Sequence, residues 1–145
     1  MSCYTRLLIT WISEEPFILQ RIEKYISADD FTDELYHKVA IKLFDGIREG
    51  NFSPASFVSM FDDEEDQKNV ALLFNTKLTG LDGLPLEMDN RSQRQKAFHD
   101  ILVKVKANSI EYYSEKLASD VNLLTKVIAQ KKLLEEMKNT IINID

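Results

Sequence analysis

The fold is decided by residues 32–50, TDELYHKVAIKLFDGIREG. Apolar side chains recur there at steps of three and four residues, the spacing that places them on one face of an α-helix. These side chains are Tyr36, Val39, Ala40, Leu43, Phe44 and Ile47. Thr32 is in position to cap the N-terminus of this helix, and Gly50 can adopt the left-handed conformation that commonly ends one. We therefore predict a central core helix around which shorter helices pack.

The same helical spacing dominates the chain on both sides of this stretch. A first helix should end near Ser13, because the residue before Pro16 is pushed out of the α conformation, and Pro16 suits the first turn of a second helix. Ser53 and Pro54 form a further cap-and-start pair, and residues 80–90, GLDGLPLEMDN, read as a loop. Alternating strand patterns are absent, so the sequence predicts an all-α fold.

Residues 91–145 show the three- and four-residue apolar spacing of a helix almost throughout. A single helix of that length would extend about 80 Å, which is implausible beside a small bundle. Ser119 and Asp120 are residues of the N-cap type, so we place a turn there. The expected architecture is a helical bundle over residues 1–110 followed by a C-terminal helical hairpin over residues 111–145. Because the last helix can pack only against the helix before it, we expect truncation after Ala118 to leave most of the cooperative unfolding transition intact.

Composition and charge limit the functions that the chain can have. Residues 1–90 hold 8 Lys and Arg against 17 Asp and Glu, whereas residues 91–145 hold 10 against 7. The whole chain has a net charge of −6. This acidic balance predicts weak or no binding to nucleic acid, since neutralisation of phosphate charges supplies most non-specific affinity. No run approaches the roughly 18 apolar residues of a membrane span. The single cysteine, Cys3, favours a reducing, cytoplasmic location, and we expect the isolated chain to be monomeric.

Residue types that carry chemistry are sparse and isolated. His37 and His99 are the only histidines, and neither has a second ligand three or four residues away, as a helical metal motif requires. The acidic run at residues 62–66, DDEED, lacks the interleaved spacing and the turn glycine of a calcium loop, and it suits the positive end of a helix. We therefore predict no catalytic residue, no metal site and no cofactor, and hence no enzyme activity in this chain.

The order of several local features resembles a known family. The features are RLLITW at residues 6–11, Glu15-Pro16, Asp30-Phe31, Tyr36-His37, the helix end at Gly50, and Ser53-Pro54. Together they are similar to the C-terminal helicase-binding domain of bacterial DNA primase, DnaG, over essentially the whole chain. The resemblance implies an interaction domain that docks on the N-terminal domains of the hexameric, DnaB-type replicative helicase and couples priming to unwinding at the replication fork. A full primase also has zinc-binding and polymerase domains, so the resemblance implies a fragment that makes no primers itself.

Two other interpretations stay open. The N-terminal domain of the replicative helicase is a similar bundle with a D-F step before a helix that bears a histidine. A linker to an ATPase is expected after that domain, whereas a helical hairpin follows the bundle here. A generic helical adaptor is the other alternative.

The expected partner-binding residues lie in the last helix. A seven-residue repeat formed by Leu123, Val127, Leu134, Met137 and Ile141, with Gln130 as a polar member, predicts a seam that packs against the preceding helix near Tyr112 and Tyr113. Other aliphatic residues fall beside or beyond that seam, and exposed aliphatic groups of this kind mark interaction sites. The predicted anchors are Leu124, Ile128, Leu133, Ile142 and Ile144, and the predicted basic rim is Lys126, Lys131, Lys132 and Lys138.

Overall fold

A computed structural model describes residues 3–50, 57–75, 91–140 and 142. These residues form six α-helices and contain no β-strand, which confirms the all-α prediction. The helices are α1 (Cys3–Glu14), α2 (Ile18–Ile22), α3 (Glu34–Glu49), α5 (Glu64–Asn75), α6 (Arg91–Lys116) and α7 (Leu124–Asn139). Three short 3-10 helices are η1 (Ala28–Asp30), η2 (Val58–Met60) and η3 (Val121–Leu123). The predicted start at Ser53-Pro54, the predicted loop at residues 80–90, Ile141 and Ile144 lie outside the described residues.

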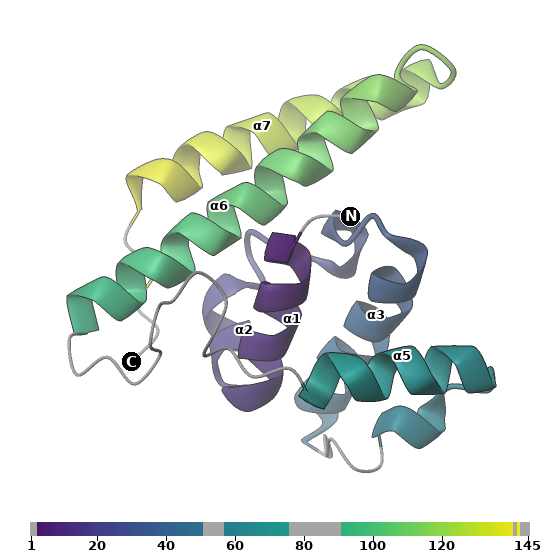
Figure 1. Cartoon of the computed structure of the whole chain (residues 1–145). Helices are drawn as coiled ribbons and strands as arrows, with labels where there is room; N and C mark the ends of the chain where they lie inside the picture. The colour runs from purple at the N-terminus through teal and green to yellow at the C-terminus, as the bar shows by residue number, and fades with distance from the viewer. Residues whose placement is uncertain (1–2, 51–56, 76–90, 141, 143–145) are drawn as a thin grey trace.

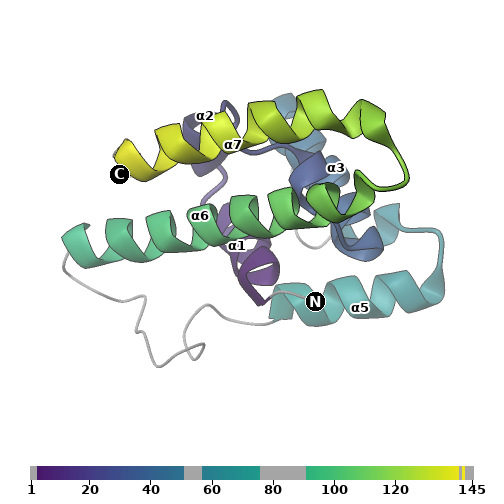
Figure 2. The same ribbon diagram turned by 90° about the horizontal axis from the view of Figure 1, so that it is seen from above.

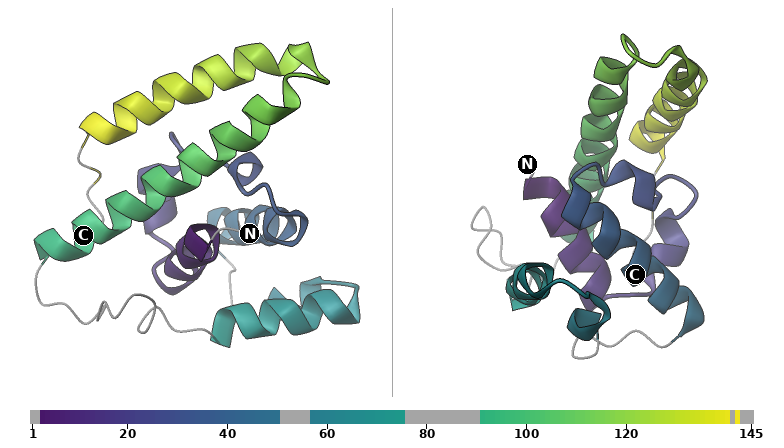
Figure 3. Two further views of the ribbon diagram at one scale, coloured as in Figure 1. Left: turned by 45° about the horizontal axis from the view of Figure 1, so that its top comes forward. Right: turned by 90° about the vertical axis from the view of Figure 1, so that its right-hand side faces the viewer.

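The helices are arranged with two long members on one side of the molecule. Helices α6 and α7 lie antiparallel and side by side (Figures 1 and 2). Helices α1 and α3 lie between this pair and α5, as both views in Figure 3 show. Helix α1 contacts α3, α5 and α6, so it is the element that joins the layers. We call α6, α7 and the turn between them the hairpin, and α1, α2, α3, α5, η1 and η2 the bundle.

Helix α3 has the buried face that its sequence predicts. Tyr36, Val39, Ala40, Leu43 and Phe44 are buried, and Ile47 is half-buried. Gly50 ends the helix with a φ of 74°, in the left-handed region, as expected. The predicted cap at Thr32 is wrong by one residue: Asp33 is the N-cap, and its Oδ1 accepts from the backbone N–H groups of Leu35 and Tyr36 at 3.0 and 3.2 Å.

The core joins the hairpin to the bundle through aromatic contacts. The Trp11 and Phe98 rings meet edge to face with centroids 5.1 Å apart, which links α1 to α6. The Trp11 indole N–H donates to a carboxylate oxygen of Glu15 at 2.6 Å, and the Arg94 guanidinium pairs with that same oxygen. The first half of α6 is therefore a core helix of the bundle as well as one arm of the hairpin.

The turn of the hairpin lies where the sequence places it. Helix α6 ends at Lys116 after running without a break through residue 110. Asp120 then caps η3, its Oδ1 accepting from the backbone N–H of Asn122 at 3.0 Å. The prediction of a turn at Ser119 and Asp120, made without a glycine or proline to support it, is confirmed.

The expectation that the last helix adds little to the bundle core is wrong. Met137 is fully buried and Ile142 is only 7% exposed, and both belong to the main hydrophobic core. Thr140 has extended backbone angles, so the chain leaves the axis of α7 there before it reaches Ile142. The C-terminal end of the hairpin thus contributes to the core of the bundle.

Candidate protein-interaction surface

Three large aliphatic side chains are exposed together where the hairpin turns. Val121 is 78% exposed, Leu124 52% and Ile128 47%. Their spacing of three and four residues places them on one face of η3 and the start of α7. We call these three residues the tip patch. The turn that carries it projects beyond the helices beneath it in Figure 1, so a partner can approach it freely.

Four lysines of α7 surround or follow the tip patch, and they differ in what they contact. Lys131 and Lys132 are exposed and continue the stripe of the tip patch along the helix. Lys126 is half-buried: its ammonium lies 3.7 Å from an Asp29 carboxylate oxygen and 4.0 Å from the centre of the Tyr113 ring. Lys138 pairs with Glu135 at 3.8 Å. Lys131 and Lys132 are therefore the better placed of the four to meet an acidic partner.

The five predicted anchors differ in how exposed they are. Leu124 and Ile128 are exposed on the tip patch. Leu133 is half-buried and packs against the core, and Ile142 is buried within it, so neither is available as an exposed anchor. Ile144 lies outside the described residues. Leu133 lies toward the end of the hairpin that packs on the bundle, and Ile142 follows that end, so both side chains lie against the core.

Val121 is the residue of the tip patch that the sequence analysis missed. It precedes Leu124 by three residues and Ile128 by seven, so the helical spacing that identified the other two also contained it. The predicted seam lies on another face of η3 and α7: Val127 and Met137 are buried, and Leu123 and Leu134 are half-buried.

The two histidines, which were considered as metal ligands, lie among packing and hydrogen-bond contacts of the fold. His37 Nδ1–H donates to the Ala28 carbonyl oxygen at 2.9 Å, which fastens η1 to α3. His99 lines a shallow depression of about 370 Å³ with Tyr4, Lys104 and Lys138, among others. Within the described ranges, no group of three or more His, Cys, Asp or Glu residues could hold a metal ion. None of the helices in those ranges is long and apolar enough to cross a membrane.

The titratable groups with shifted pKa values also owe their shifts to packing and pairing. Burial raises the pKa of the Tyr36 phenol above its ordinary value, and the nearby Asp33 carboxylate adds to the effect, while Arg6 opposes it. A hydrogen bond to Glu136 raises the pKa of Lys24, and one to Tyr112 raises the pKa of Lys116. Both lysines are at the surface, so these shifts reflect local pairs and not a reactive site.

The fold and the site define an all-α protein with a helical hairpin that carries an exposed aliphatic patch. No protein-family model, no curated protein sequence and no solved structure matches this chain.

Proposed function

We propose that this chain is a protein-interaction domain that docks on the N-terminal domains of a hexameric replicative helicase. The proposal rests on the resemblance of its local features to the helicase-binding domain of bacterial primase. In that role the chain is non-catalytic, acts in the cytoplasm and holds primase at the replication fork.

One observation supports a protein partner above all: the tip patch. Exposed aliphatic residues clustered on a projecting turn are unfavourable in water and mark interaction sites when they lie together. Fully burying a Leu or Ile side chain contributes roughly 1.5–3 kcal/mol, so the patch can anchor a complex. The neighbouring Lys131 and Lys132 suit an acidic rim on the partner, where they would speed encounter more than they strengthen binding.

The test is a titration of the isolated N-terminal domains of a matched replicative helicase with the full chain. Replacing both Leu124 and Ile128 by alanine should weaken binding by roughly 30-fold or more, the loss of about 2 kcal/mol that is typical of hot spots. The matched control is Ile41→Ala, which truncates an exposed aliphatic side chain on α3 and should leave binding unchanged.

One outcome would relocate the interface, and another would contradict the proposed partner. Unchanged affinity for the folded double variant would move the interface away from the tip patch. Absence of any binding to helicase, together with binding to the C-terminal domain of primase, would favour the alternative in which this chain is itself the helicase's N-terminal domain.

A further inference from the structure

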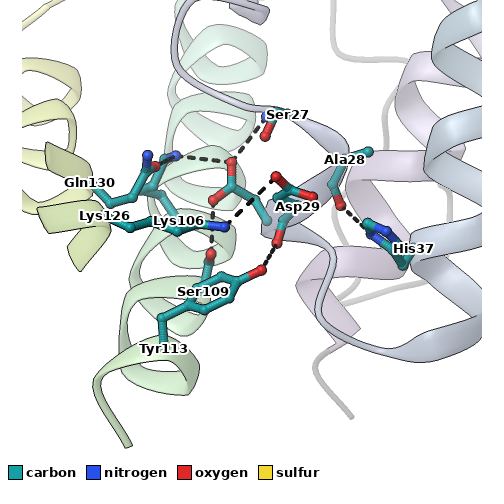
Figure 4. Close-up of polar contacts among 10 residues, drawn as sticks. Ser27, Ala28, Asp29, His37, Lys106, Ser109, Tyr113, Lys126 and Gln130 are labelled. Atoms are coloured by element: carbon teal, nitrogen blue, oxygen red, sulfur yellow. Dashed lines mark hydrogen bonds and ion pairs between the residues drawn. The ribbon is translucent and has the colours of Figure 1, made fainter. Parts of the chain in front are cut away.

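Helix α7 is held to the rest of the molecule by the face opposite the tip patch. Lys106 on α6 donates to Asp30 of η1 at 2.9 Å and to the side-chain oxygen of Gln130 on α7. The side chains of Lys106 and Asp30 are only 1% and 4% exposed. On the same side of α7, the Lys126 ammonium lies 3.7 Å from an Asp29 carboxylate oxygen (Figure 4). Polar contacts therefore fix the inner face of α7, and the face that carries the tip patch is left to the solvent.

The outer face of η3 and α7 has an acid at one end and two bases at the other. Asp120 is exposed and comes directly before Val121, the first residue of the tip patch. Lys131 and Lys132 are exposed and follow Ile128, the last residue of the tip patch, by three and four positions. A second copy of the chain that lay antiparallel along this face would present the same groups in the reverse order. Each acidic end would then meet a basic end, and the aliphatic residues would meet each other.

One antiparallel register satisfies both kinds of contact. When Leu124 of each copy faces Ile128 of the other, Lys132 falls opposite Asp120 of the second copy. Lys131 falls opposite Val121, whose side chain the methylene stem of the lysine can cover while its ammonium stays in water. Because the arrangement is symmetric, each of these contacts occurs twice.

The neighbouring registers are less favourable. Moving the second copy by one helical turn, about four residues, sets Val121 against Glu135 in one direction and Ile128 against Asp120 in the other. Each shift replaces an aliphatic contact by a contact with a carboxylate, which loses its water without gaining a donor. Each shift also separates Asp120 from Lys132. The order of residues along the outer face thus favours one register.

We propose that two copies of this chain form a weak symmetric dimer in which their α7 helices pack antiparallel through the tip patch. Three aliphatic side chains per copy bury less than the roughly 1,200 Å² of a standard interface, so we expect a Kd on the order of 100 μM. The monomer expected from the sequence then prevails well below that concentration. The inference stands apart from the proposed function, because the dimer needs no helicase. Any partner of the tip patch competes with the second copy.

The first experiment is sedimentation of the full chain from roughly 1 μM to 1 mM, with a reductant for Cys3. About 0.15 M salt screens the repulsion between two copies of net charge −6. The average mass should rise toward that of two copies and stop there, because a symmetric pair uses up its interface. Leu124→Asp should stay monomeric throughout. The matched control Ile41→Asp, at a 41% exposed position on α3, should dimerise like the parent.

Paired charge reversals test the register. Asp120→Lys and Lys132→Asp each place two like-charge contacts in their own dimer, so each should self-associate about tenfold more weakly than the parent. An equimolar mixture of the two variants restores both opposite-charge contacts and should recover the parental affinity. Glu64→Lys and Lys68→Asp are the control pair, because they change the net charge equally at exposed positions of α5. Neither control should change self-association by more than about twofold.

A parent that stays monomeric at about 1 mM would overturn the inference and leave the tip patch to another partner. A mixture of the folded charge variants that associates no better than either variant alone would also overturn it. Asp120 caps η3, so Asp120→Lys may fail to fold for that reason alone. In that event Asp120→Asn decides, because asparagine also caps. Added to Lys132→Asp, it removes the like-charge contacts and should tighten self-association, and an unchanged affinity would equally overturn the inference.

Discussion

Met137 tests whether the end of the hairpin belongs to the core of the bundle. Its side chain is fully buried among residues that include members of the bundle, although it lies near the end of the chain. Replacing it by alanine removes three side-chain heavy atoms. At about 0.8 kcal/mol for each buried methylene equivalent, the loss of transfer free energy is about 2.4 kcal/mol, and the cavity left behind raises it to roughly 3 kcal/mol.

The assay is urea unfolding of the full chain, followed by far-ultraviolet circular dichroism. Ile128→Ala is the matched control, because it truncates an aliphatic side chain of the same helix that is 47% exposed. A substitution at such a surface position should change the free energy of unfolding by about 0.5 kcal/mol or less. Both variants should unfold in one transition with the parental dependence on urea.

Equal costs for the two variants would refute the reasoning. So would a first transition that involves only α7 and that Met137→Ala shifts without moving the main transition. Either result would restore the expectation from the sequence that α7 can be removed without harm to the bundle.

Three further predictions concern α3. Asp33→Ala should lower the free energy of unfolding by about 1 kcal/mol through loss of the N-cap, whereas Thr32→Ala should cost clearly less; equal costs in urea unfolding would argue against Asp33 as the cap. Gly50→Ala should cost roughly 1 kcal/mol because φ is positive there, although no atom within 4 Å would meet the new Cβ; a neutral or stabilising effect would contradict this. The pKa of the Tyr36 phenol is raised in the folded chain, so above its ordinary pKa near 10 the unfolded chain loses the phenol proton first, and the free energy of unfolding falls as pH rises further. Tyr36→Phe should make that fall less steep. An unchanged slope of the free energy of unfolding between about pH 10 and 11 would exclude Tyr36 as its source.

Local chemistry explains most of what the sequence could predict. The buried stripe of α3, its end at Gly50 and the restart at Asp120 depend on side-chain spacing and backbone preference within a few residues. The error at Thr32 is of the same local kind, because Thr32 and Asp33 can both cap and only the folded backbone decides between them. Phe17 shows a further limit: nothing in the local spacing after Pro16 indicates that its side chain is exposed, yet it is 46% exposed in the turn that precedes α2.

Long-range packing explains what the sequence could not predict. A seven-residue repeat shows that α7 has a buried seam, but it does not show that Met137 reaches the core of the bundle. A lone lysine such as Lys106 is most often a surface residue, and its partner Asp30 lies 76 positions away in the chain. The candidate surface was predicted in part for the same reason: spacing identified Leu124 and Ile128, whereas the burial of Ile142 depends on how the chain turns after α7.

The contact between Trp11 and Phe98 gives the molecule a built-in optical reporter. Trp11 is the only tryptophan of the chain, so all indole fluorescence arises where α1 meets α6. Its ring is buried, with the Arg94 guanidinium 5.6 Å from the ring centroid, and its N–H is held by Glu15. A buried indole emits at a shorter wavelength than a hydrated one, so separation of α6 from α1 should shift the emission to the red. An unlabelled sample can therefore show whether an event at the far end of the hairpin reaches the root of α6.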